Sequence, residues 1–233
     1  MTATAAPTQF WVPAPPGWVE IAAFDTDARA EAHWRDMIEP ARPHLGDGPT
    51  DHLYVGLREA RASVVGSGVT SAGVVVTEVD DEPAVWTFST TIEHVASGEV
   101  NPVALVERAV GTAGTVERVE DITLVDGRTA VQAFLTLTPQ TRLGRGHGAA
   151  APRPTTPGKP PVERLGSCVV AVALPGRPHD LVLTTGSSPD PEHRPLLAHV
   201  VSAIAAGVHV GTEPPEGVAK ASGVLPVDGS AGA

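Results

Sequence analysis

The clearest pattern of hydrophobic and polar positions lies between residues 69 and 95, where two strand-like runs flank a short acidic turn at 80–83. Side chains in the second run alternate, with Trp86, Phe88 and Ile92 on one face and Thr87, Ser89 and Thr91 on the other. An alternation with a period of two residues indicates a strand with one buried face. We therefore expect a hairpin at the centre of the fold, covered or extended by the other elements.

Helical spacing is visible in four further stretches, where apolar residues recur three and four positions apart. These stretches are residues 25–39, 50–64, 101–111 and 188–206. In the second stretch Thr50 or Asp51 would serve as the N-cap. The side of this helix that faces the core would carry Leu53, Leu57, Ala60 and Val64.

The remaining regular segments are predicted to be strands. Residues 18–24 follow a proline-rich approach, and proline cannot pair inside a ladder, so this strand is expected at a sheet edge. A hairpin is expected over 115–138, because Asp126-Gly127 separates two runs rich in β-forming residues. Two more strands are expected at 165–174 and 180–185.

Together these elements predict an α+β fold, a single twisted and mainly antiparallel sheet with helices on both faces. The chain has 233 residues, and 42% of them are hydrophobic, which is enough for one sizeable core. We expect one domain over residues 10–210. The ends at 1–9 and 211–233 are rich in small residues, glycine and proline and are expected to be disordered.

Residues 139–162 interrupt the pattern with a proline- and glycine-rich insert that contains no acidic residue. Its four basic side chains are Arg142, Arg145, Arg153 and Lys159. One interpretation is a mobile insertion that is tolerated because long loops cost little additional entropy. The other is a basic arm that contacts an acidic partner protein.

The composition argues against several classes of partner and location. A net charge of −11 disfavours nucleic acid and anionic membranes. The sequence contains no apolar run of about 18 residues, so we expect no membrane insertion. Met1–Gln9 show no secretory signal, and a single cysteine fits a reducing compartment. These features predict a cytoplasmic protein.

The sequence contains little recognisable chemistry. Cys168 alternates with apolar neighbours in a predicted strand, which favours a buried structural thiol. The nine histidines show no metal-ligand spacing, and we expect no metal, no cofactor and no catalytic residue set. Trp86 and His94, on one face of the central strand, are the candidates for the mouth of a pocket.

Three segments carry a resemblance to a known family. They are the approach at 10–18 (FWVPAPPGW), the strand at 181–185 (LVLTT) and the helix at 196–206. With the order of elements over residues 10–210, they resemble the Mog1/PsbP-like α/β/α sandwich, and in particular small actinobacterial proteins of that architecture. The resemblance implies an accessory or binding subunit of a larger assembly and supplies no catalytic residues.

Two functions are therefore expected. The leading one is a non-enzymatic module that binds another protein, with a secretion-associated role as one version of it. It would use the basic insert and the surface of the helix at 53–64. The alternative is a small-ligand-binding protein or enzyme with a pocket between sheet and helices.

Overall fold

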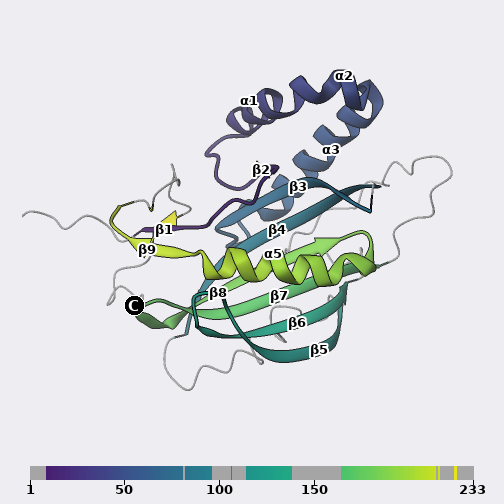
Figure 1. Ribbon diagram of the computed structural model, residues 1–233. Coiled ribbons are helices and arrows are strands. Elements are labelled where there is room, and N and C mark those ends of the chain that lie inside the picture. The colour runs from purple at the N-terminus through teal and green to yellow at the C-terminus, as the bar shows by residue number, and fades with distance from the viewer. Residues whose placement is uncertain are drawn as a thin grey trace, which may run out of the picture.

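A computed structural model describes residues 9–80, 82–95, 106, 114–137, 164–213, 215 and 223–224. Its main feature is a seven-stranded sheet in which every neighbouring pair is antiparallel (Figure 1). In spatial order the strands are β2 (Trp18–Glu20), β3 (Ser71–Val79), β4 (Glu82–His94), β8 (Arg177–Ser188), β7 (Leu165–Leu174), β6 (Thr129–Leu137) and β5 (Gly114–Thr123). The predicted α+β class is confirmed.

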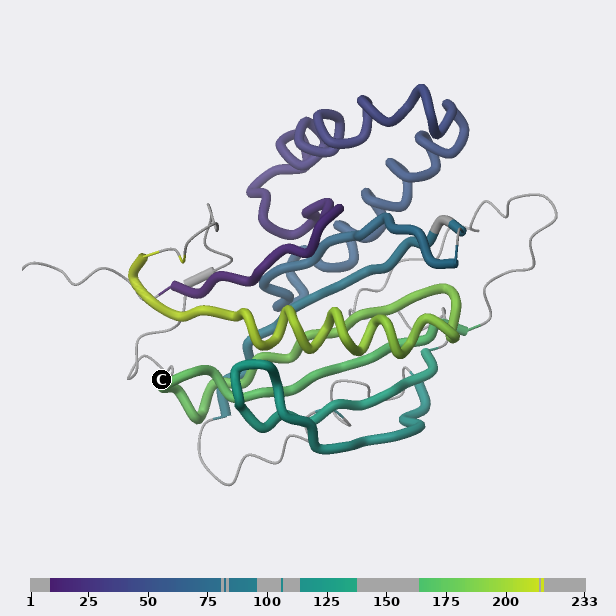
Figure 2. Tube along the Cα trace, viewed as in Figure 1, coloured from purple at the N-terminus to yellow at the C-terminus, as the bar shows by residue number. Residues whose placement is uncertain are grey.

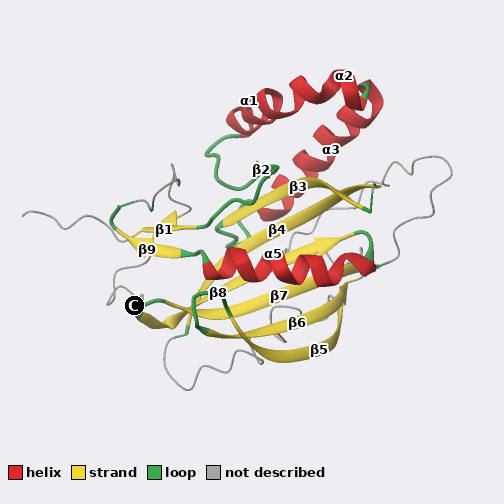
Figure 3. Ribbon diagram, in the orientation of Figure 1, coloured by secondary structure: helices red, strands yellow, loops and turns green. Residues whose placement is uncertain are grey.

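Helices cover both faces of this sheet, as predicted (Figure 3). They are α1 (Asp27–Ile38), α2 (Arg42–Leu45), α3 (Asp47–Val64) and α5 (Arg194–Ala206). The neighbours Val74 and Val75 on β3 identify the two layers. Val75 belongs to the cluster that contains the buried side of α5, whereas Val74 packs with Trp34 of α1 and Leu57 of α3.

Both predicted hairpins are present. In the central one, β3 pairs with β4 from Ser71↔Thr90 to Val79↔Glu82, and the turn places Asp80 at a φ of 52°. In the second, β5 and β6 are joined through Asp126 and Gly127, and Gly127 has a φ of 85°. Glycine adopts this left-handed conformation without a steric penalty, which explains why the Asp-Gly signal located the turn correctly.

Buried Arg61 of α3 connects the α1–α3 layer to the edge strand. Its guanidinium donates hydrogen bonds to the backbone oxygens of Ile21 and Phe24, each at 2.8 Å, and to Asp27 at 2.7 Å. Because Ile21 and Phe24 lie between β2 and α1 and Asp27 is the first residue of α1, the Arg61 side chain holds α3 against both the edge of the sheet and the start of α1.

Three element boundaries differ from the predictions for local reasons. The edge strand ends at Glu20, because the Glu20 carboxylate accepts the N–H groups of Ala22 and Ala23 and turns the chain away from the sheet. Helix α3 begins at Asp47, so the predicted caps lie inside it; Gly46 is the N-cap. Helix α5 begins at Arg194, after a 3₁₀ turn over Pro191–His193.

A second, three-stranded sheet was not predicted. Its strands are β1 (Gln9–Trp11), β9 (His209–Gly211) and β10 (Gly223–Val224), in the order β10-β1-β9. The N-terminal and C-terminal parts of the chain thus run side by side (Figure 2). Gln9 and Gly211, together with β10, are strand residues within the segments 1–9 and 211–233. Phe10 and Trp11, which belong to the predicted domain, are only 1% and 2% exposed.

Several predicted features lie outside the described residues. They are residues 1–8, the insert at 139–162 and most of the C-terminal stretch beyond 215. Of the helix expected at 101–111, Val106 alone is described. It is helical and packs against Ala133, Leu135 and Val169 on the face of the sheet opposite α5.

Close packing of α5 leads to a test of the core. A Cβ added at Gly186 of β8 would lie 2.6 Å from Val201 of α5 and 2.9 Å from the Phe88 ring. We expect Gly186→Ala to lower the free energy of unfolding by about 2 kcal/mol, since overpacking forces the helix and sheet apart. Urea denaturation measures this change.

Gly56 provides the matched control. It lies inside α3, and an added Cβ there meets nothing within 4 Å. Gly56→Ala should stabilise the protein by roughly 0.5–1 kcal/mol through helix propensity. Equal effects of the two substitutions would contradict the close contact between α5 and β8.

Candidate functional site

A cavity of about 640 Å³ lies between the C-terminal part of α3 and the face of the sheet opposite α5. The α3 side contributes Ala60, Ser63 and Val64, and the segment that follows contributes Val69. The sheet side combines five strands, β3, β4, β8, β7 and β6. Its lining residues are Ala72, Thr87, Phe88, Ser89, Thr91, Glu93, Leu135, Leu137, Val169, Leu183, Thr185 and Ser187.

The sheet register concentrates hydroxyl groups on the floor of this cavity. Ser167 of β7 pairs with Ser187 of β8, and Ser187 pairs with Thr87 of β4. One step along the strands, Thr185 pairs with Ser89. Thr91 is the next residue of β4 on the same face. We call these six residues the hydroxyl band: Thr87, Ser89, Thr91, Ser167, Thr185 and Ser187. Five of them line the cavity, and Ser167 is fully buried next to Ser187, outside the described lining.

Two members of the hydroxyl band are bonded within the protein. The Ser167 hydroxyl donates to the Gly186 oxygen at 2.7 Å and lies 2.9 Å from the Ser187 hydroxyl. Among the described residues, no protein group hydrogen-bonds with the hydroxyls of Ser89, Thr91 or Thr185. Those half-buried hydroxyls therefore face the cavity with both donor and acceptor capacity unused.

Apolar side chains border the hydroxyl band on two sides. On one side lie Ile21, Val64 and Val69, and on the other lie Leu135 and Val169. Within the described lining, Glu93 supplies the one titratable side chain. The cavity thus combines apolar walls with a central strip of uncharged polar groups, an arrangement typical of small-molecule sites.

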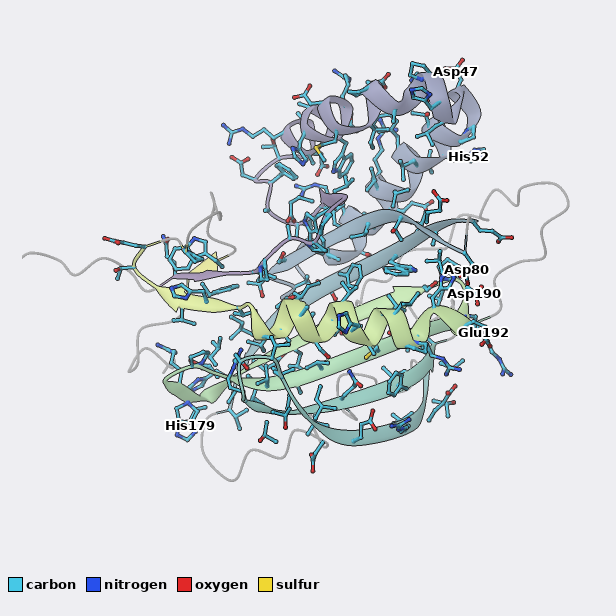
Figure 4. All side chains as sticks on the ribbon, viewed as in Figure 1. Asp47, His52, Asp80, His179, Asp190 and Glu192 are labelled. Atoms are coloured by element: carbon cyan, nitrogen blue, oxygen red, sulfur yellow. The ribbon has the colours of Figure 1, made fainter. Side chains whose placement is uncertain are left out.

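Trp86, a predicted pocket residue, lies on the α5 face and is absent from the described cavity lining. Its indole N–H donates to Nδ1 of His193 at 3.2 Å, and the Ser188 hydroxyl lies 3.1 Å from the same nitrogen. Nδ1 must therefore act as an acceptor. Asp190 and Glu192 belong to the turn that precedes α5 (Figure 4), and the Asp190 N–H donates to the Ser188 hydroxyl at 3.1 Å.

His94, the other predicted pocket residue, is also absent from the described lining. It lies eight residues from Trp86 on β4, or roughly 26 Å along an extended strand. The structure therefore does not bring the two together. His94 is 46% exposed and contacts Asp180, its cross-strand partner, at 2.7 Å.

Asp180 is a buried carboxylate held by His94 and Arg177. Burial raises its pKa, but the hydrogen bonds from His94 and Arg177 outweigh burial and hold the pKa below the ordinary value of 3.8. The ionised form is therefore the form that stabilises the folded state.

The lowered pKa of Asp180 predicts how the effect of an Asp180 substitution on stability depends on pH. We expect Asp180→Asn to destabilise the protein by about 1–3 kcal/mol near neutral pH, through loss of charged hydrogen bonds. The difference from wild type should shrink as the pH falls below 3.8, because wild-type Asp180 then becomes protonated too. Urea denaturation over a pH series measures it. Asp121→Asn, at an exposed position of β5, serves as the control, and a difference independent of pH would contradict this account.

The other candidates from the sequence have varied outcomes. Arg142, Arg145, Arg153 and Lys159 lie outside the described residues. On α3, Leu57 is buried, whereas Leu53, Ala60 and Val64 are partly buried, and the contact surface expected on this helix stays a prediction. Cys168 is confirmed as a buried thiol, and burial raises its pKa to about 12. In the described part of the chain no cluster of His, Cys, Asp or Glu could hold a metal ion.

No protein-family model matches the chain, and no curated protein matches it. Among solved structures, the crystal structure of LpqN, involved in cell envelope biogenesis of Mycobacterium tuberculosis, matches 90% of this chain and 87% of its own. Sequence identity is 11% and the TM-score is 0.38. The similarity is to a mycobacterial protein, and the Mog1/PsbP-like assignment stays a prediction.

None of the helices in the described ranges combines the length and apolar character needed to cross a bilayer.

Proposed function

We propose that this protein is a non-enzymatic binding protein that holds a small, largely apolar organic molecule in the cavity between α3 and the sheet. One observation carries the proposal: the 640 Å³ cavity has apolar walls, and three hydroxyls on its floor have no hydrogen-bond partner among the described residues. Its volume falls within the roughly 300–1,000 Å³ typical of small-molecule sites. It also lies where the sequence-based alternative expected a pocket, between sheet and helices.

Binding rather than catalysis is favoured by the groups that face the cavity. A serine or threonine nucleophile needs an adjacent base, and Glu93 is the one titratable side chain in the described lining. The contact between Ser188 and His193 lies on the other face of the sheet. Ser188 is only 1% exposed there, and Nδ1 of His193 is shared with Trp86, which fits a structural role.

The protein-binding role, the secretion-associated version of it, the cytoplasmic location and the Mog1/PsbP kinship remain predictions from the sequence. Their shared candidate surface is the insert at 139–162. A pull-down from the native host that compares the full chain with a version lacking 139–162 tests the partner. Failure to recover any protein with either version would count against it.

The cavity proposal has a direct test in fluorescence. N-phenyl-1-naphthylamine brightens when it leaves water for an apolar site. We expect a saturable increase with a stoichiometry of about one molecule per chain, as a single cavity requires. An increase that stays linear with probe concentration, or no increase, would rule out the cavity as a binding site.

A further inference from the structure

We propose that the ligand carries an uncharged polyhydroxyl group, which lies on the hydroxyl band while its apolar part packs against the cavity walls. This inference rests on the proposed function and adds the chemical class of the ligand. The residues that would contact the polar group first are Ser89 and Thr185, which are cross-strand partners at the centre of the floor.

The position of the hydroxyl band in the sheet supports this inference. The band spans β7, β8 and β4, the three central strands in the order β2-β3-β4-β8-β7-β6-β5. Central strands are usually apolar on a covered face, because a buried polar group without a partner costs free energy. The residues that flank the Thr185–Ser89 pair on the adjacent strands, Val169 of β7 and Ala72 of β3, are apolar, as expected for a covered face.

The geometry of the band suits several contacts at once. Neighbouring strands lie about 4.8 Å apart, and residues on one face of a strand repeat about every 7 Å. Ser89, Thr185 and Thr91 therefore form a small grid of hydroxyls. A compact ligand group with hydroxyls on several carbons can contact more than one point of this grid, whereas a single polar atom can contact one.

Charge disfavours an anionic group, and hydrogen-bonding chemistry favours a hydroxyl group. A Ser or Thr hydroxyl both donates and accepts, and a ligand hydroxyl matches it in both roles. Carboxylates and phosphates are bound most strongly by Arg, Lys or backbone N–H groups. Neither Arg nor Lys occurs in the described lining, and the chain has a net charge of −11. An anionic ligand is thus disfavoured both locally and by the whole molecule.

Three octyl-chain probes test the ligand class by displacement of N-phenyl-1-naphthylamine, each kept below its micelle concentration. They are octyl glucoside, octanoate and octyltrimethylammonium, which share a tail and differ in the polar group. We expect octyl glucoside to displace the dye at concentrations about tenfold lower than the other two, since two or three net hydrogen bonds have this effect.

Amino-acid substitutions test whether the hydroxyl band causes the preference for octyl glucoside. In Ser89→Ala combined with Thr185→Val, which removes two hydroxyls with little change of shape, the preference for octyl glucoside over octanoate should fall to near unity. Thr123→Val makes the same change at an exposed position of β5, outside the described cavity lining, and should keep the wild-type preference. Circular dichroism confirms that each variant is folded.

The outcomes separate this inference from the proposed function. If the dye binds in the cavity but octanoate or octyltrimethylammonium displaces it as well as octyl glucoside, the ligand class is wrong and the binding role stands. If the double variant keeps the full preference, the hydroxyl band is not the contact and the inference fails. If the dye does not bind, the proposed function fails, and the inference fails with it.

Discussion

Replacing Arg61 with methionine is expected to lower the free energy of unfolding by about 3 kcal/mol. The Arg61 side chain is 6% exposed, and its guanidinium donates to the backbone oxygens of Ile21 and Phe24. Methionine keeps most of the side-chain volume but donates no hydrogen bond. Hydrogen bonds from a charged group contribute about 1.5–3 kcal/mol each. In the variant, the buried backbone oxygen of Ile21 has lost the guanidinium as its donor. Urea denaturation followed by circular dichroism measures the change.

Arg58 gives a matched control on the same helix. It is 55% exposed and pairs with Glu31 at 2.7 Å. An exposed ion pair contributes roughly 0–1 kcal/mol, so Arg58→Met should cause a far smaller loss. If the two substitutions had equal effects, Arg61 would not be the residue that fixes the α1–α3 layer to the sheet, and the wall of the cavity formed by α3 would be less firmly placed.

Filling the cavity from its floor should reduce binding of N-phenyl-1-naphthylamine by more than tenfold. Ser89→Phe places an aromatic ring in the centre of the cavity, where the cross-strand neighbours Ala72 and Thr185 are small. The ring and the dye would compete for the same apolar volume, and loss of a few buried apolar groups is enough for a tenfold effect. Titration of the dye measures the dissociation constant.

Thr123→Phe adds the same ring at an exposed position of β5 and controls for a general effect of the aromatic substitution. The control should bind the dye as wild type does. If Ser89→Phe folds normally and still binds the dye with wild-type affinity, the dye binds elsewhere on the protein.

The sequence predicted the layers of the fold because the relevant signals are local. Period-two alternation identified β4, the Asp-Gly turn identified the β5–β6 hairpin, and the apolar stripe around Leu57 identified the inward face of α3. The small sheet was missed because its strands are two or three residues long, too short to show a period. Their pairing depends on contacts between distant parts of the chain.

The candidate site was harder to predict. The alternating Thr87, Ser89 and Thr91 were visible in the sequence, as were Thr185 and Ser187 in another strand. The sequence did not show that β4 and β8 are neighbours in the sheet. These strands are more than 80 residues apart in the chain, and their hydroxyl side chains form one continuous polar strip. Trp86 and His94 were chosen from the opposite face, because aromatic and imidazole side chains are more conspicuous than hydroxyls.

The most direct test of the binding cavity is photolabelling with an octyl glucoside that carries a diazirine in its alkyl chain, followed by peptide mass spectrometry. We predict labels on the peptides that contain Val64–Val69 and Val169, the two apolar borders of the hydroxyl band, and their loss in Ser89→Phe. Labels confined to other surfaces, or labels on these peptides that persist unchanged in Ser89→Phe, would contradict the assignment of this cavity as the binding site.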